Sequence, residues 1–126
     1  MGSKAFTDLK VWQVAHEVNL SVYRLTESFP QREMYGMASQ MRRAAYSIPS
    51  SIVEGFGRRA TKDKAHFYTI AMGSAEELKY GLIAARDLGY LKDFGVLWPK
   101  LESISKMLRS LTDAVLSGGS AAMPDS

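Results

Sequence analysis

The sequence predicts an all-α fold, an antiparallel up-down four-helix bundle, and three observations lead to this prediction. Apolar residues recur every three or four positions in four separate segments, the spacing that places side chains on one face of a helix. The connections between these segments are short, so consecutive helices are expected to be antiparallel neighbours. No stretch alternates apolar and polar residues like a half-buried strand. At 126 residues, the chain fits one domain with its own core.

The first helix is expected over about residues 8–29. Thr7 or Asp8 is expected to cap its start, because a short side-chain oxygen can accept a hydrogen bond from an otherwise unpaired backbone N–H. Pro30 is expected to end it, since proline cannot continue the hydrogen-bond pattern of a helix. Its apolar stripe consists of Val11, Val14, Val18, Val22, Leu25 and Phe29, widened by Trp12, Ala15 and Asn19.

The second helix, over about residues 34–57, holds a proline in its middle. The apolar stripe keeps its phase on both sides of Pro49, which predicts one proline-kinked helix. Pro49 cannot donate to the carbonyl of Ala45, at a cost of ~3 kcal/mol unless packing compensates, and nearby serine hydroxyls are available to the freed groups. The alternative is a true break, with Ser47 capping a short second piece. The serines are Ser47, Ser50 and Ser51, and the stripe consists of Met37, Met41, Ala44, Ile48, Ile52 and Phe56.

The third helix, over about residues 61–88, follows a short connection. Gly55 and Gly57 are expected to weaken the last turn of the preceding helix and to permit a sharp exit. Thr61 is the expected N-cap, and the glycine of the run DLGYL is expected to end the helix and let Tyr90 pack back over the bundle. Small residues are dense along this helix, which predicts close approach to a neighbouring helix. Its stripe consists of Phe67, Ala71, Ser74, Leu78, Leu82 and Ala85.

The fourth helix carries the most regular pattern, a heptad seam with spacings of four and three. Pro99 lies near its first turn, where a missing N–H costs little. Gly118 and Gly119 are expected to end it. The seam consists of Leu97, Leu101, Ile104, Leu108, Leu111 and Val115.

The expected domain limits are an N-terminal arm or cloning remnant at residues 1–7, the bundle at residues 8–117 and a flexible C-terminal tail at residues 118–126. The chain has no cysteine, which excludes disulfides and thiolate metal sites. No apolar run is long enough to cross a bilayer, and the first ten residues lack the apolar core of a secretion signal. We therefore expect a cytoplasmic protein with no membrane partner.

The positive charge of the chain is regional. The formal net charge is +3 and the pI is about 9.2. Residues 42–64 hold six basic residues and two acids, a local balance of +4, whereas the balance over the rest of the chain is −1. The six basic residues are Arg42, Arg43, Arg58, Arg59, Lys62 and Lys64.

These basic residues are not expected to form a single patch on one protomer. Arg42 and Arg58 are sixteen positions apart, or ~24 Å along a helix, and at ~100° per residue they point to nearly opposite sides. Arg42 and Arg43 are thus a separate feature, expected to pair with an acid on a neighbouring helix. A single cluster is expected around the connection between the second and third helices, made of Arg58, Arg59, Lys62 and Lys64.

Three runs, FTDLKVWQVA, SQMRRAAYSIPSSIVEGFGRR and GSAEELKYGLIAARDLGYL, resemble a known family. It consists of small four-helix-bundle proteins encoded in intervening sequences of bacterial 23S ribosomal RNA genes. The resemblance covers about residues 6–116, and the proline and the EGFGRR ending inside a helix are its most specific part. The family's motif maps onto Arg42, Arg43, Ser47, Pro49, Ser50, Glu54, Gly55, Gly57, Arg58 and Arg59.

The resemblance implies a ring-like homo-oligomer, with a pentamer as the expected form. A distant relative is the accessory protein of diversity-generating retroelements, which has a basic surface and works with a reverse transcriptase and nucleic acid. By this resemblance, the expected partners are other copies of the chain, RNA or DNA, or a nucleic-acid-processing protein. The modest net charge of +3 departs from that of a strongly basic nucleic-acid binder.

Patterns for catalysis or metal binding are weak. A di-iron bundle needs two glutamates and two Glu-x-x-His motifs, whereas this chain offers one loose match, from Asp63 to His66. We interpret His16 and His66 as helix-surface residues. The run GFGRRATK lacks the spacing of a phosphate-binding loop. Glu54 lies inside an apolar pattern, so we expect it to bond with an arginine or a hydroxyl.

The sequence thus predicts a protein that is not an enzyme and has no cofactor. The first hypothesis is nucleic-acid binding through the cluster at the second connection, with Arg42 and Arg43 contributing if assembly aligns them. Such contacts are made to phosphates and carry no base specificity. The second hypothesis is an oligomeric scaffold or accessory protein that recruits a protein partner, with the arginines used in subunit pairing.

Overall fold

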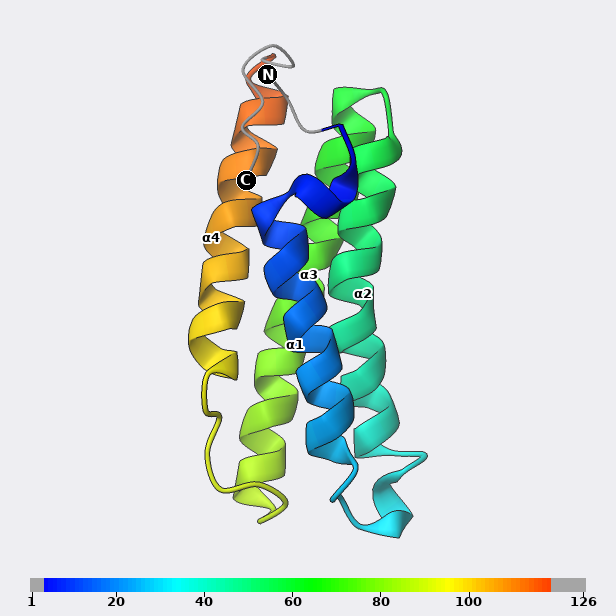
Figure 1. The fold of residues 1–126 in the computed structure, drawn as a ribbon, viewed down its shortest axis with the longest axis vertical. Helices are drawn as coiled ribbons and strands as arrows, with labels where there is room; N and C mark the ends of the chain where they lie inside the picture. The colour runs from blue at the N-terminus through cyan, green and yellow to red at the C-terminus, as the bar shows by residue number, and fades with distance from the viewer. Residues whose placement is uncertain (1–3, 119–126) are drawn as a thin grey trace.

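The computed structural model describes residues 4–118 and forms an elongated bundle of four long helices (Figure 1). No strand occurs within these residues. The helices run alternately up and down and connect at opposite ends of the bundle, which confirms the predicted all-α four-helix fold. The elements are η1 (Phe6–Asp8), α1 (Lys10–Thr26), η2 (Gln31–Glu33), α2 (Met37–Gly57), α3 (Thr61–Asp87) and α4 (Leu97–Leu116).

The core is built from the predicted stripes. Each helix packs against the next in sequence, and α1 also packs against α4, so the four helices enclose one core. All six residues of the α4 seam are buried. Six predicted members are only partly buried, namely Trp12, Val14, Leu25, Met37, Phe56 and Phe67. None of the helices in residues 4–118 combines the length and the apolar character that a membrane span requires.

Both predicted N-caps are wrong. The N-cap of α1 is Leu9, because its side chain is buried in the core, and the carboxylate of Asp8 instead accepts a hydrogen bond from the N–H of Ala5 in the preceding turn (3.2 Å). The N-cap of α3 is Ala60 in an extended conformation, and Thr61 is the first helical residue. Neither helix start receives a side-chain capping bond.

Helix α1 also ends earlier than expected, at Thr26 rather than near Phe29. The hydroxyl of Thr26 donates to the carbonyl of Val22 (2.8 Å), and that of Ser28 donates to the carbonyl of Leu25 (3.2 Å). These side-chain bonds satisfy carbonyls at the helix end. Phe29 comes after the last residue of the helix and is buried. Its side chain therefore packs the connection to α2 against the core.

Helix α2 is continuous from Met37 to Gly57 with Pro49 inside it, so the alternative of a break at Ser47 is wrong. The Ser47 hydroxyl accepts a hydrogen bond from the Ser74 hydroxyl of α3 (2.7 Å), and the Ser50 hydroxyl donates to the Ser47 carbonyl (3.3 Å). The first bond thus joins α2 to α3, and the second stays within one turn of α2. Neither bond is made to the Ala45 carbonyl, which Pro49 leaves without its helical donor.

The close approach predicted from small residues occurs between α2 and α3. A Cβ atom on Gly55 would lie 2.6 Å from a ring carbon of Tyr68, and one on Gly81 would lie 2.8 Å from the Cγ of Met41. Real Cβ contacts are essentially never that short, so both positions depend on glycine. Gly55 therefore has a packing role in addition to the loose last turn expected of it.

At the lower end of the bundle in Figure 1, Tyr90 joins the end of α3 to the connection between α1 and α2. Helix α3 ends in a Schellman arrangement, with Gly89 at a φ of 83° and the N–H of Tyr90 bonded to the carbonyl of Ala85 (2.8 Å). The Tyr90 ring packs on Phe29 (5.4 Å between centroids), and its hydroxyl donates to Glu33 (2.8 Å). The predicted packing of Tyr90 over the bundle is confirmed.

Candidate nucleic-acid interface

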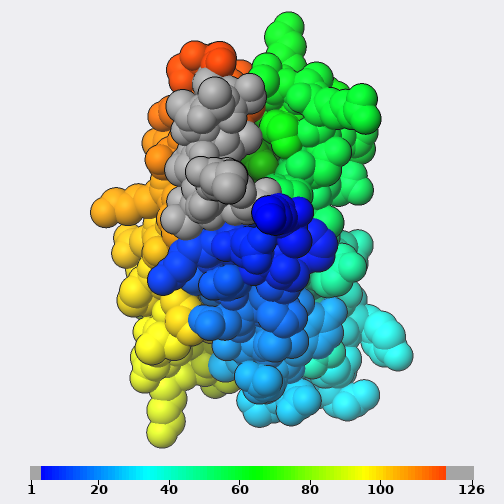
Figure 2. Space-filling view, turned by 45° about the horizontal axis from the view of Figure 1, so that its top comes forward, coloured from blue at the N-terminus to red at the C-terminus, as the bar shows by residue number. Residues whose placement is uncertain are grey.

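The connection from α2 to α3 forms the upper end of the bundle in Figure 1, and Figure 2 shows green side chains projecting at the top of the view, above the blue N-terminal segment. Arg58, Arg59 and Lys62 are exposed there, whereas Lys64 is partly buried. We call these four residues the basic cluster. The structure therefore brings together the four residues that the sequence grouped, in three different environments.

Arg58 is oriented by two neighbours. Its guanidinium lies 3.0 Å from the carboxylate of Glu54, one helical turn earlier, and 4.8 Å from the centroid of the Phe67 ring. The predicted bond between Glu54 and an arginine is confirmed. Glu54 itself is exposed, because its position on α2 faces away from the core despite the apolar residues around it. The pair leaves Arg58 with half of its surface available to solvent.

The side chain of Lys64 binds the carboxyl end of α2 instead of extending into solvent. Its ammonium donates to the carbonyls of Phe56 (2.9 Å) and Gly55 (3.3 Å), and it lies 5.7 Å from the centroid of the Phe56 ring. A cation at the carboxyl end of a helix is favourable, because the last carbonyls carry partial negative charge. Burial lowers the pKa of Lys64. Lys64 therefore caps α2, and its charge is already used within the chain.

Arg59 and Lys62 differ from the other two members. Within residues 4–118, neither side chain takes part in a hydrogen bond or an ion pair. They flank the start of α3, whose first amides receive no side-chain cap. Helix amino termini carry partial positive charge, so backbone and side chains favour an anion at the same place. Asp63 in the first turn opposes this preference in part.

Arg42 and Arg43 are separate from the basic cluster, as predicted, but the expected acidic partner is wrong. The guanidinium of Arg42 donates to the hydroxyl of Thr26 (2.7 Å) and to the carbonyl of Tyr23 (3.2 Å), and it lies over the Tyr23 ring. It therefore binds neutral acceptors at the carboxyl end of α1, where a cation is favoured. Arg43 is exposed and makes one long bond to Ser39 (3.4 Å).

The rings beneath the cations were not foreseen. Phe67 lies under Arg58 and Phe56 lies beside Lys64. Phe56 and Phe67 flank the basic residues of the run GFGRRATKDKAHF, and this flanking is the signal that points to them. Such rings fix the position of cations by cation–π attraction.

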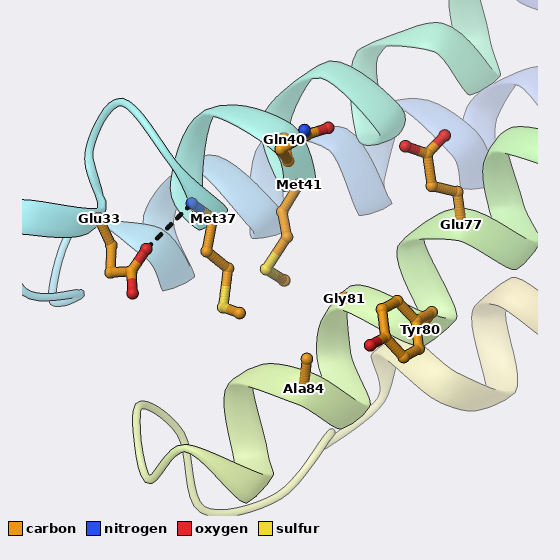
Figure 3. A pocket seen from close by; sticks show the side chains of 8 residues that line it. All are labelled: Glu33, Met37, Gln40, Met41, Glu77, Tyr80, Gly81 and Ala84. Atoms are coloured by element: carbon orange, nitrogen blue, oxygen red, sulfur yellow. Dashed lines mark hydrogen bonds between the residues drawn. The ribbon is translucent and has the colours of Figure 1, made fainter.

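A hollow at the other end of the α2–α3 seam is the second candidate surface (Figure 3). Its volume is about 470 Å³, and its floor is apolar. Tyr80 is 70% exposed at its rim. We call this hollow the methionine groove, and its residues are Glu33, Met37, Gln40 and Met41 on one side and Glu77, Tyr80, Gly81 and Ala84 on the other.

Glu33 closes one end of the methionine groove. Its carboxylate accepts hydrogen bonds from the hydroxyl of Tyr90 (2.8 Å) and from the N–H of Met37 (3.2 Å), the latter drawn in Figure 3. The bond from Tyr90, followed by that from Met37 and the charge of Arg32, lowers the pKa of Glu33. The carboxylate therefore stays ionised and holds the first turn of α2 in place.

The two histidines lie on helix surfaces. His16 stacks on Trp12 (5.0 Å between centroids), and His66 is exposed, with its ring steeply inclined (71°) to that of Phe67. Asp63 and His66 gain no third ligand, since residues 4–118 contain no group of three histidine or acidic side chains arranged to hold a metal ion.

Comparisons with known proteins identify a family and related solved structures. The family model described as 23S rRNA-intervening sequence protein matches residues 7–110. A crystal structure of a protein of unknown function from the S23 ribosomal protein family of Bacteroides thetaiotaomicron has a TM-score of 0.59 and 20% sequence identity, covering 85% of this chain and 95% of that one. At this identity the likeness supports the fold alone. No curated protein matches the chain.

Proposed function

The chain belongs to the 23S rRNA-intervening sequence protein family, and from this premise we propose that it is a cytoplasmic, non-enzymatic protein that binds RNA or another nucleic acid. The observation that carries the proposal is the exposed group of Arg58, Arg59 and Lys62 beside the start of α3. Arginine and lysine contacts to phosphates supply most of the sequence-independent affinity for nucleic acid.

We propose unequal roles within the basic cluster. Arg59 and Lys62 supply phosphate contacts, because their charges have no partner within residues 4–118. Arg58 supplies a weaker contact, since Glu54 offsets its charge. Lys64 and Arg42 hold helix ends together and contribute little. Arg43 contributes only if assembly brings it beside a bound strand.

The proposal is tested by titrating a single-stranded RNA at several salt concentrations. Affinity is expected to fall with salt, and the double variant Arg59→Ala/Lys62→Ala is expected to bind more weakly and to reduce the log–log salt slope by about 1.4, or ~0.7 per phosphate contact. The matched control is Lys106→Ala/Arg109→Ala, which removes two exposed cations of α4. An equal loss of RNA affinity in the two double variants, or no binding of RNA at low salt, would contradict the proposal.

A second candidate function, an oligomeric scaffold, is favoured by the methionine groove. Its apolar floor and the exposed Tyr80 offer a surface suited to another helix. We place the contact of a ring-like homo-oligomer there, with a pentamer as the expected form. The bend that Pro49 is expected to impose on α2 would then set the angle between this contact and the basic cluster, which lies at the opposite end of α2.

Native mass measured by light scattering tests the scaffold. Tyr80→Glu places a charge at the rim of the groove and is expected to shift the protein toward the monomer, because an unpaired charge is costly to bury. Tyr35→Glu, at another highly exposed tyrosine, is the matched control and should leave the mass unchanged. A monomeric wild-type protein, or one whose mass Tyr80→Glu does not alter, would refute this function.

A further inference from the structure

The methionine groove carries negative charge that no cation in its own lining balances. Two of the residues that line it are acids, Glu33 and Glu77, and none is a lysine or an arginine. Glu77 is exposed and makes no ion pair within residues 4–118. The hydrogen bonds of Glu33 come from two uncharged donors, the hydroxyl of Tyr90 and the N–H of Met37. An apolar hollow with carboxylates at its edge is complementary to a surface that combines rings with cations.

The side of the bundle formed by α1 and α2 has the opposite character. From residue 37 to residue 53, α2 holds two arginines and no acid. Arg42 binds the end of α1 and lies 4.9 Å from the centroid of the Tyr23 ring, whereas Arg43 is exposed and makes only one long side-chain bond (3.4 Å). Tyr46, three positions further along α2, is 60% exposed. We call Tyr23, Arg42, Arg43 and Tyr46 the arginine face.

We infer that the arginine face of one copy of the chain packs on the methionine groove of the next copy, so that the copies assemble head to tail. This inference rests on the scaffold function proposed above, and it names the surface that meets the groove. Arg43 of one copy pairs with Glu77 of its neighbour, and Tyr46 and Tyr80 supply apolar contact beside that pair. Arginine and aromatic residues are enriched in protein–protein interfaces, and opposite charges on the two surfaces fix their register.

The two surfaces lie at the same level on neighbouring sides of the bundle. On α2, the groove uses Met37, Gln40 and Met41, and the arginine face begins at Arg42 in the same half of that helix. The groove opens between α2 and α3, whereas the arginine face lies between α1 and α2. Two different patches give a heterologous contact, which generates a ring if the rotation between copies closes. Because patches at one level add rotation with little shift along the bundle, a closed ring is favoured over an open filament.

The test reverses the charge on each side of the contact and measures native mass by light scattering. Arg43→Glu and Glu77→Arg are each expected to lower the mass to that of the monomer, because each sets like charges against one another. The double variant Arg43→Glu/Glu77→Arg restores opposite charges in every contact and is expected to regain the wild-type mass. Lys106→Glu and Glu102→Arg, at exposed positions of α4, are the matched controls and should leave the mass unchanged. Circular dichroism checks that each variant keeps its helices.

Mixing two monomeric variants tests whether the contact is head to tail. Tyr80→Glu blocks the groove and keeps the arginine face, whereas Arg43→Glu blocks the arginine face and keeps the groove. An equal mixture is expected to form a complex of two chains and nothing larger, because only one of the two contacts that a ring needs is intact. If the groove of one copy instead met the groove of another, Arg43→Glu alone would keep the wild-type mass, and the inference would be overturned.

Failure of this inference is distinct from failure of the scaffold function. If Tyr80→Glu dissociates a wild-type oligomer while Arg43→Glu leaves the mass unchanged, the groove is a contact but the arginine face is not, and the scaffold function stands without this inference. The same conclusion follows if Arg43→Glu/Glu77→Arg stays monomeric, since opposite charges then fail to restore the contact. A monomeric wild-type protein would remove the scaffold function and this inference together.

Discussion

Replacing Gly55 with alanine is expected to lower the free energy of unfolding by about 1–3 kcal/mol, the range typical of an overpacked core. The new Cβ would lie 2.6 Å from the Cε1 and 2.9 Å from the Cδ1 of Tyr68. The ring of Tyr68 is only 1% exposed, so it has no free space into which to move. The clash therefore outweighs the ~1 kcal/mol that alanine gains over glycine inside a helix.

Gly73→Ala is the matched control for this prediction. Gly73 lies in the middle of α3, is exposed, and a Cβ there would meet nothing within 4 Å. The same substitution is thus expected to stabilise the protein by about 0.5–1 kcal/mol, through helix propensity alone. Urea unfolding followed by circular dichroism measures both changes. If the two variants shift in the same direction, the close packing of α2 on α3 is wrong.

A double variant tests whether the clash is with Tyr68. Tyr68→Leu shortens the side chain that a Cβ at position 55 would meet, so adding it to Gly55→Ala is expected to cost less than the two single changes together. Neighbouring residues that share a contact are coupled in this way. If the free-energy changes of the two single variants simply add in the double variant, the strain lies elsewhere on α2.

The sequence predicted the helices well because their stripes are regular. The α4 seam is buried along its whole length, and the stripe of α2 keeps its phase through Pro49. The predicted caps failed for a local reason. Whether Asp8 or Leu9 precedes α1 depends on how tightly Leu9 packs into the core, and the pattern of side chains along the chain does not contain that information.

The small residues predicted a close approach between helices, but the sequence did not indicate which side chains meet there. Tyr68 falls outside the predicted stripe of α3, so nothing identified it as the neighbour of Gly55. The position of the basic cluster followed from the short connection, but the partner that each charged side chain binds did not. Lys64 binds the carbonyls that end α2, and Arg42 binds Thr26 across the α1–α2 contact. A charge count cannot distinguish these cations from Arg59 and Lys62, whose charges have no partner among residues 4–118.

The fold is expected to lose about 2–3 kcal/mol of stability at alkaline pH through Tyr68 alone. Burial raises the pKa of Tyr68 to about 12, from an ordinary value of 10.0. Between these two values the unfolded chain releases the phenolic proton while the folded chain retains it. The folded state then binds more protons, so stability falls as pH rises from 10 to 12, by ~1.4 kcal/mol for each pH unit.

Tyr68→Phe removes this proton without removing the ring, so its unfolding free energy is expected to stay close to that of wild type at pH 8 and to exceed it by about 2–3 kcal/mol near pH 12. Lys64, whose pKa is lowered, is present in both proteins, so its contribution cancels in the comparison. Tyr35→Phe is the control, because that side chain is 96% exposed. The measurement is the urea midpoint of each protein at pH 8, 10 and 12. If the midpoints of wild type and Tyr68→Phe change with pH in the same way, the phenol of Tyr68 reaches water. In that case α2 and α3 do not pack as closely as Gly55 requires.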